Sequence, residues 1–177
     1  MTVQYRMLKE DEICREQFGQ FVRRQEVGKC WRREEGEWVI RDAPFIDDWS
    51  EEDYQILIDC LKNTARTGGL VYAAFCGKAL KGFVSVEAEL FGSGKQYLDL
   101  TSLHVSGDLR GRGIGRELFL EACRWAKQRG AAKLYISGHS AVETQAFYRA
   151  MGCVETEEYN QGHVEAEPFD CQLECIL

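Results

Sequence analysis

The stretch Ser106-Gly-Asp-Leu-Arg-Gly-Arg-Gly-Ile-Gly115 joins a predicted strand to a predicted helix. In the strand, Tyr97–Val105, alternation places Leu98 and Leu100 on one side and, on the other, Asp99, Thr101, Leu103 and Val105. The helix carries apolar residues at helical spacing and ends at Arg129-Gly130. The segment Leu98–Gln128 is therefore predicted to be a strand, a glycine-rich turn and a helix.

This turn is suited to binding a phosphate. The first amides of the helix have no intrahelical partners, they lie at the positive end of the helix dipole, and they are flanked by Arg110, Arg112 and Arg116. The spacing excludes a Walker A loop, which needs Gly-Lys-Ser/Thr, and a dinucleotide turn, which needs Gly-x-Gly-x-x-Gly. A turn that only starts a helix and binds stray anions is the alternative interpretation.

Two motifs together indicate a family. Arg110-Gly-Arg-Gly-Ile-Gly115 fits the pattern Arg/Gln-x-x-Gly-x-Gly/Ala, and Ala146-Phe-Tyr-Arg-Ala-Met-Gly152 fits the pattern Phe-Tyr-x-x-x-Gly. With these motifs, and with the order of its expected elements over essentially the whole chain, the protein resembles the GNAT superfamily of N-acetyltransferases. The resemblance implies an α/β fold with a central mixed, mostly antiparallel sheet of about seven strands, flanked by about four helices and splayed at the acetyl-CoA site. It also implies acetyl-CoA as co-substrate and no metal.

Length and composition are those of an ordinary soluble domain. The chain has 177 residues, 45% hydrophobic and 29% charged, which predicts one domain over residues 1–177. No apolar run approaches a membrane span and no signal peptide is visible, so we expect a cytoplasmic protein without a membrane partner. A net charge of -7 argues against nucleic-acid binding and is compatible with a cationic partner. The eight cysteines form no Cys-x-x-Cys pair and are expected to be small buried hydrophobes.

Patterning predicts the remaining elements. Strands are expected at Val3–Leu8, Leu70–Cys76, Gly82–Leu90, Lys133–Ser137, Val154–Tyr159 and Cys171–Leu177. Helices are expected at Asp11–Arg24, after an N-cap at Ser50, and after a capping box from Ser140 to Glu143. Segment 28–48 is expected to be irregular and to act as a binding lid. Its neighbourhood of Trp31, Trp38, Trp49, Asp47 and Asp48 would suit an amine, although a core closure or a homodimer contact explains it equally well.

The resemblance also assigns roles to residues. Backbone amides of Leu103–Val105 would face the thioester and the pantetheine arm, and the turn would hold the pyrophosphate. The expected cofactor-binding residues are thus Leu103, His104, Val105, Arg110, Gly111, Arg112, Gly113, Ile114, Gly115 and Arg116. Tyr148 corresponds to the family tyrosine that protonates the departing thiolate, a role that a water could also fill.

The base that deprotonates the amine is less defined. Asp99 is the first candidate, because alternation places it with Leu103 and because some family members carry a base at this position; a structural carboxylate is an equal alternative. Glu87 and Glu89 could act through water, His139 lies near the expected splay, and the His104 side chain is expected to be structural.

One position departs from the family pattern. Many members have an asparagine that contacts the cofactor where this chain has Ala141, and Ser140 or Thr144 could substitute for it. Two functions therefore stay open. The first is transfer of an acetyl group from acetyl-CoA to a primary amine of a small molecule or peptide. The second is a non-catalytic acyl-CoA-binding regulatory module.

Overall fold

The fold is built on one mixed sheet. The structure is a computed structural model that describes residues 2–177. Its seven-stranded sheet has the order β1 (Val3–Met7), β4 (Leu70–Cys76), β5 (Ala79–Val86), β6 (Tyr97–Val105), β7 (Lys133–Gly138), β9 (Cys171–Ile176) and β8 (Val154–Glu155). Only β6 and β7 pair in parallel, and the other neighbours are antiparallel. The predicted fold class, with its mostly antiparallel sheet, is confirmed.

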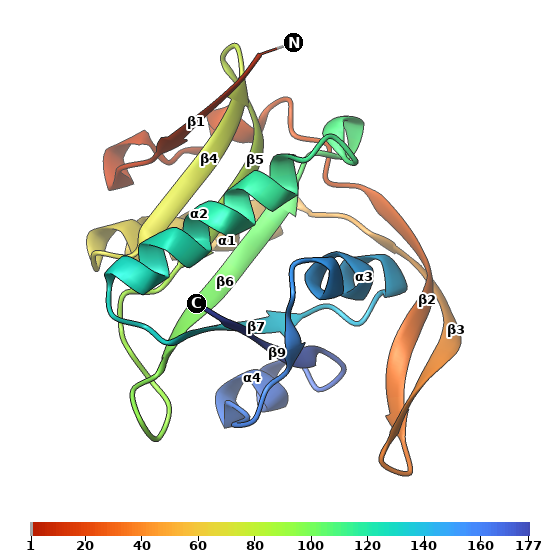
Figure 1. The fold of residues 1–177 in the computed structure, drawn as a ribbon. Coiled ribbons are helices and arrows are strands. Elements are labelled where there is room, and N and C mark those ends of the chain that lie inside the picture. The colour runs from red at the N-terminus through yellow and green to blue at the C-terminus, as the bar shows by residue number, and fades with distance from the viewer. Residues whose placement is uncertain (1) are drawn as a thin grey trace.

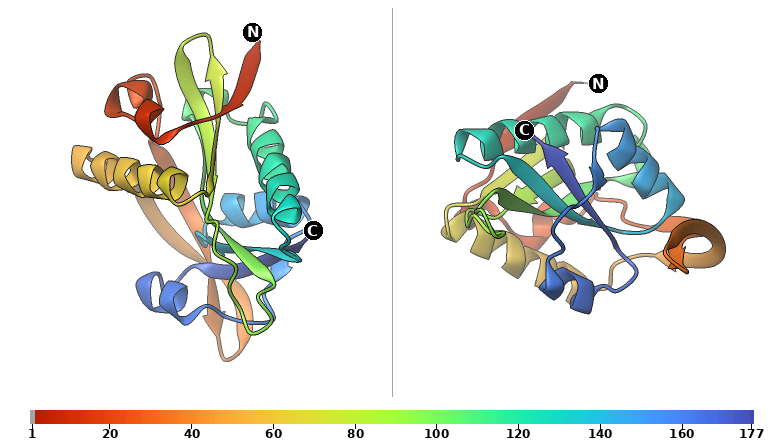
Figure 2. Two further views of the ribbon diagram at one scale, coloured as in Figure 1. Left: turned by 90° about the vertical axis from the view of Figure 1, so that its left-hand side faces the viewer. Right: turned by 60° about the horizontal axis from the view of Figure 1, so that its bottom comes forward.

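Helices cover both faces of this sheet. Within residues 2–177 the α-helices are α1 (Glu51–Arg66), α2 (Ile114–Gln128), α3 (Val142–Ala150) and α4 (Gln161–Ala166). Figure 2 shows α1 and α2 on opposite faces. Buried residues of α2 such as Leu118 pack with Leu98 and Leu100, whereas Ile58 and Leu61 of α1 pack with the opposite side of the sheet. None of the helices within residues 2–177 is long and apolar enough to cross a bilayer.

Local signals define the two long helices as predicted. The Ser50 hydroxyl accepts a hydrogen bond from the Asp53 amide, and the Asp53 carboxylate accepts one from the Ser50 amide at 2.8 Å, so α1 begins with a capping box. Helix α2 begins after Gly113 and ends at Arg129-Gly130.

The expected helix at Asp11–Arg24 is wrong. The segment contains two short 3-10 turns, Glu10–Glu12 and Arg15–Phe18. Beyond them, other parts of the fold bind the backbone: Lys81 Nζ donates to the Gln20 carbonyl at 2.6 Å, and the Val22 amide donates to Ser106 Oγ at 2.9 Å. Tertiary hydrogen bonds thus replace those that a longer helix would make.

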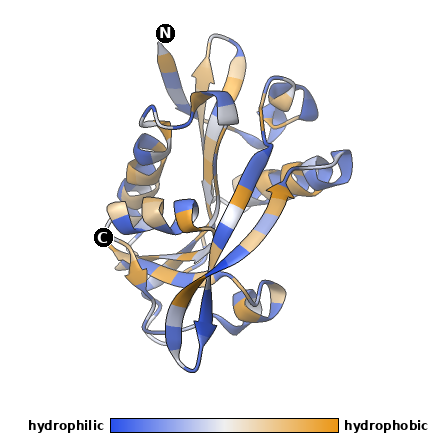
Figure 3. Ribbon diagram, turned by 90° about the vertical axis from the view of Figure 1, so that its right-hand side faces the viewer, coloured by the Kyte–Doolittle hydropathy of each residue, from blue (hydrophilic) through white to orange (hydrophobic). Residues whose placement is uncertain are grey.

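The expected irregular lid is a regular β-hairpin. Strands β2 (Gln25–Glu34) and β3 (Glu37–Asp47) are joined by Glu35 and Gly36, which have φ values of 51° and 86°, as a tight hairpin turn requires. Figure 3 shows hydrophobic and hydrophilic residues alternating along the hairpin, which Figure 1 shows beside α3. The Trp31 amide donates to the Ser140 carbonyl at 2.8 Å, and Cys30 and Ala141 form a β-bridge, so the hairpin is attached to the chain entering α3.

The central strand contains a bulge that the sequence did not reveal. Val86 pairs with Leu100 but Ser85 pairs with Ser102, so β6 holds one extra residue at this point. The extra residue reverses the alternation, and Leu103 joins Leu98 and Leu100 in the core beneath α2. The prediction that Leu103 and Val105 share a side with Asp99 is therefore wrong.

Three boundaries also differ from the predictions. Strand β5 ends at Val86, β8 has only two residues, and the connection to β9 contains α4. The capping box at Ser140 is absent, because α3 begins after Ala141 and Ser140 Oγ instead accepts a hydrogen bond from Arg32 at 2.8 Å.

Candidate active site

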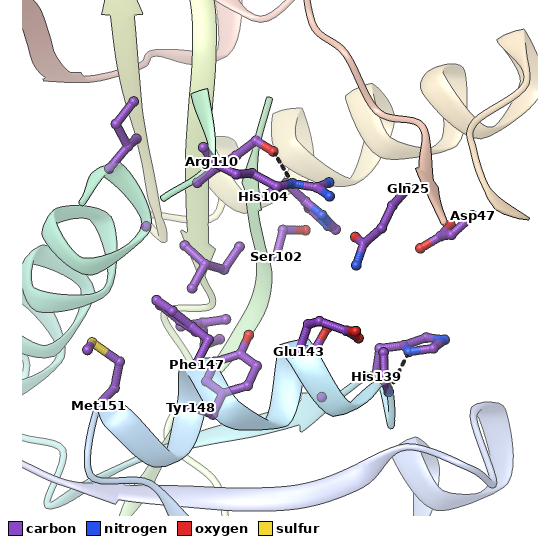
Figure 4. A pocket seen from close by; sticks show the side chains of 18 of the residues that line it. Gln25, Asp47, Ser102, His104, Arg110, His139, Glu143, Phe147, Tyr148 and Met151 are labelled. Carbon is purple, nitrogen blue, oxygen red and sulfur yellow. Dashed lines mark hydrogen bonds between the residues drawn. The ribbon is translucent and has the colours of Figure 1, made fainter. Parts of the chain in front are cut away.

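A cavity of about 860 Å³ lies where β6 and β7 separate. Their pairing ends at Leu100 and Ile136, while β6 continues to Val105. The cavity is lined by β6, the turn before α2, the end of β7, α3, the base of the hairpin and the loop before β9. Figure 4 shows the side chains of Arg110 and His104 on one side of it and those of Phe147 and Tyr148 on the other. The splayed sheet predicted from the sequence is thus present.

The splay exposes backbone groups of β6. The Ser106 amide donates to the Lys81 carbonyl of β5, and the register continues through His104 opposite Phe83. In an antiparallel pair the intervening residues direct their amide and carbonyl groups to the other edge. The amides of Leu103 and Val105, rather than that of His104, therefore face the cavity.

The glycine-rich turn forms one end of the cavity. Gly111 and Gly113 have φ values of 74° and 82°, and a Cβ atom at either position would meet nothing within 4 Å, so the backbone is open to an approaching group. The amides that open α2 lie at the positive end of its dipole. Of the ten predicted cofactor-binding residues all except Arg112 line the cavity. This cradle fits the pyrophosphate of acetyl-CoA.

Tyr148 closes the opposite wall. Its side chain is buried, and a Cβ atom at Gly138 would lie 3.2 Å from ring atom Cε2, so the ring packs directly on the end of β7. Figure 4 shows the phenol directed into the cavity. Burial, with smaller contributions from Cys153 and Asp170, raises the pKa of Tyr148, so the hydroxyl keeps its proton at neutral pH.

His104 is a neutral wall residue. Its ring lies edge-on to Trp49 at a centroid distance of 4.8 Å and contacts Phe83. Burial, helped by the positive charges of Arg23 and Arg110, lowers the pKa of His104 to about 3. The side chain is therefore uncharged at neutral pH, in agreement with its predicted structural role.

Asp99 lies outside the cavity. Its Oδ2 atom is 2.7 Å from His163 Nε2 of α4, and the His163 ring stacks on Tyr135. The hydrogen bond to Asp99 raises the pKa of His163. The base role of Asp99 stays a prediction, although this pairing accounts for the carboxylate structurally.

Of the other three predicted bases, only one lies at the cavity. Glu87 accepts a hydrogen bond from Thr64 at 2.5 Å and Glu89 is exposed, and neither lines the cavity. His139 does line it, with Nδ1 accepting the Ala141 amide at 3.0 Å.

The loop before β9 supplies carboxylates to the cavity, and Asp170 among them was not singled out in the sequence. Asp170 and Glu167, from the loop before β9, line the cavity together with Ser137, whose hydroxyl donates to Asp170 Oδ2 at 3.1 Å. Burial raises the pKa of Asp170. The position was detectable only if the last strand had been placed beside β7, because that pairing brings residue 170 to the splay.

The structure places Ser140 and Thr144, the two predicted substitutes for the family asparagine, in different surroundings. Ala141 is buried with Val27 and Cys30 of the hairpin, and Ser140 is held by Arg32, whereas Thr144 lines the cavity. Thr144 is therefore the better placed of the two predicted substitutes.

The tryptophans anchor the hairpin and core rather than line the cavity. Arg149 lies 4.6 Å above the Trp31 ring, Trp38 Nε1 donates to Glu155, and Trp49 packs on Phe21. At the hairpin base, Asp47 reaches the cavity, where it forms an ion pair with the buried Arg23. All three tryptophans are partly buried and pack against the two core clusters, as the core interpretation expects.

Comparison with known proteins identifies the family. The family model described as "Acetyltransferase (GNAT) family" matches residues 31–153. No curated protein sequence matches the chain significantly. Among solved structures, a candidate streptothricin acetyltransferase from Bacillus anthracis, in complex with acetyl coenzyme A, is 16% identical with a TM-score of 0.70, over 98% of this chain and 96% of that one.

Two further structures have the same fold. A PaiA N-acetyltransferase from Thermoplasma acidophilum, in complex with coenzyme A, is 17% identical with a TM-score of 0.64, over 100% of both chains. A nourseothricin acetyltransferase is 17% identical with a TM-score of 0.65, over 98% of this chain and 96% of that one. With its glycine-rich turn at the splay and the family model matched over most of its length, this chain belongs to the GNAT family of acetyltransferases.

Proposed function

We propose that the protein transfers the acetyl group of acetyl-CoA to a primary amine of a small molecule or peptide. The observation that carries this proposal is that one cavity contains both the expected acetyl-CoA-binding turn and the expected proton donor. The turn Arg110–Arg116 lies at one end of the cavity and Tyr148 at the other. The free amides of Leu103 and Val105 between them suit a carbonyl oxygen on which negative charge develops.

The proposed reaction is a direct transfer from the thioester to the amine. An ammonium group loses one proton to a base, and the nitrogen lone pair forms a bond to the acetyl carbon. The carbon–sulfur bond breaks, its electron pair goes to sulfur, and sulfur takes the Tyr148 proton. Tyr148 regains a proton from the newly bonded nitrogen. The products are an amide, free CoA and one released proton.

The acidic character of the cavity supports a cationic acceptor. Glu143, Glu167 and Asp170 line it in addition to Asp47, which is paired with Arg23, and carboxylates favour a bound ammonium group. Two of the structures with the same fold are named as streptothricin and nourseothricin acetyltransferases, and a third as a ribosomal-protein-alanine N-acetyltransferase, so both small amines and peptides belong in the acceptor panel.

The test is release of free CoA thiol from acetyl-CoA with a panel of small amines and amino-terminal peptides. The proposal expects amine-dependent release, with the acetyl group found on the amine nitrogen by mass spectrometry. If the protein binds acetyl-CoA but releases no thiol with any member of the panel, the result would instead support the non-catalytic module. Ala141, which replaces the family asparagine, is the sequence feature that favours this alternative.

A further inference from the structure

The loop before β9 presents a carboxylate to the cavity beside Tyr148. Gly138 pairs with Cys171, and the Tyr148 ring packs on Gly138, so Asp170 lies next to the Tyr148 wall. The Asp170 amide donates to the Glu167 carbonyl at 3.0 Å, closing a turn with Pro168 at its second position. This turn fixes the backbone from which the carboxylate projects.

A chain of hydrogen bonds fixes the Asp170 side chain as well. The Asn160 amide donates to the Tyr135 hydroxyl at 3.0 Å, and that hydroxyl donates to Gln172 Oε1 at 2.6 Å. Gln172 Nε2 then donates to Ser137 Oγ at 2.9 Å, and Ser137 donates to Asp170 Oδ2 at 3.1 Å. Each hydrogen bond in this series donates in the direction of Asp170, so the series ends on its carboxylate.

The consequence is a carboxylate with one engaged and one available oxygen. Oδ2 accepts a hydrogen bond from the Ser137 hydroxyl, and within residues 2–177 this is the one side-chain hydrogen bond that the Asp170 carboxylate makes, so Oδ1 is left available. A base needs a fixed oxygen with a free lone pair at the site of the proton that it removes. Asp99 also has one paired and one unpartnered oxygen, but it does not line the cavity, so its free Oδ1 is not placed at an acceptor there.

We infer that Asp170 is the base that receives the proton of the acceptor ammonium, and that Ser137 positions it. This inference rests on the proposed acetyl transfer. The ammonium N–H bond breaks, the proton binds Asp170 Oδ1, and the nitrogen keeps the electron pair with which it attacks the acetyl carbon. Asp170 later releases that proton to solvent.

Neighbouring groups shift the pKa of Asp170 in opposite directions. Burial and the negative charge of Glu167 raise the pKa of Asp170, whereas the Ser137 hydrogen bond and the nearby His139 and His163 lower it. Tyr148 faces the same carboxylate from α3 and is uncharged at neutral pH. A carboxylate with a raised pKa is a better proton acceptor than an exposed one.

The experiment is the pH dependence of kcat/KM with an alkylamine acceptor for wild type and four variants. For wild type we expect an ascending limb at the pKa of Asp170. Asp170→Asn should lose that limb and about 10²- to 10⁴-fold in rate, recovering only as the pH approaches the pKa of the amine itself. Ser137→Ala should move the limb to higher pH and Glu167→Gln to lower pH, since they remove a lowering and a raising influence respectively.

Asp99→Asn is the matched control, because it makes the same chemical change in the other candidate; its ascending limb should remain. Loss of the limb in Asp99→Asn and its retention in Asp170→Asn would overturn the inference. If wild type releases no thiol with any amine, the proposed function itself is wrong and this inference falls with it.

Unfolding gives a readout that is independent of turnover. Because the pKa of Asp170 is raised in the folded state, the charged form destabilises the fold at high pH. Asp170→Asn should therefore become more stable relative to wild type as the pH rises through that pKa, and equal to it at low pH. A variant that is less stable at every pH would show a structural role and overturn the inference.

Discussion

At the scale of single residues, the position of Tyr148 depends on the glycine beneath its ring. A Cβ atom at Gly138 would lie 3.2 Å and 3.4 Å from two carbons of that ring, closer than packed carbons tolerate without a shift. The Phe-Tyr motif predicted Tyr148, but only the fold shows that Gly138 makes room for it.

Tyr148→Phe should lower kcat by about 10²- to 10⁴-fold, since it removes the proton donor and keeps the ring. The KM for acetyl-CoA and the melting temperature should change little, because phenylalanine keeps the ring that packs on Gly138. Steady-state kinetics with an active amine measure this. An unchanged kcat would mean that a water protonates the thiolate.

The pair of His163 and Asp99 predicts how stability depends on pH. The Asp99 hydrogen bond raises the pKa of His163 in the folded state, so its stabilising contribution is complete below the unfolded value, near 6.5, and is lost as the pH rises through the folded value. Thermal unfolding of His163→Gln across pH 5 to 9 checks this. The wild type should have its largest advantage at the acidic end; an advantage that grows with pH would contradict the pairing.

At the scale of elements, the turn before α2 distinguishes two reasons for which a position can require glycine, a left-handed backbone and limited space for a side chain. Gly113 has φ +82°, which a side chain disfavours, whereas a Cβ atom at Gly115 would make ordinary contacts of 3.4 Å with Phe147 and 3.5 Å with Val105. The motif itself allows alanine at the last position, which agrees with this difference.

Gly113→Ala should destabilise the protein by about 1–2 kcal/mol, the usual penalty for a left-handed backbone, while Gly115→Ala should be nearly neutral. Urea unfolding of the two variants compares the same chemical change two residues apart. Equal destabilisation would show that space, rather than backbone conformation, requires the glycines.

How far the sequence predicted each element depended on whether its signal was local. The caps of α1 and the strand, turn and helix at Tyr97–Gln128 are local and were predicted. The bulge in β6 was not, because it is defined by the partner strand. The apolar spacing of segment 11–24 suggested a helix, yet Lys81 and Ser106 bind its backbone from distant positions.

At the scale of the whole molecule, the site is assembled from segments far apart in the chain. The two motifs predicted its ends, the turn at residues 110–116 and Tyr148. They did not predict Asp170 or the hairpin base, because these reach the cavity only through the pairing of β9 with β7 and the attachment of β2 beside Ser140. The motifs therefore located the two ends of the site, and only the topology locates the residues between them.

Everything proposed here depends on the turn Arg110–Arg116 holding the pyrophosphate of acetyl-CoA. Thermal unfolding with acetyl-CoA, CoA, ATP or NAD tests that claim directly. A ligand at about a hundred times its dissociation constant should add about 2.7 kcal/mol to the free energy of unfolding. Only the two CoA compounds should stabilise the protein, and Arg116→Glu, which places a negative charge in the part of the turn that lines the cavity, should remove the effect. If neither CoA compound stabilises the wild type at millimolar concentration, the turn does not bind the donor.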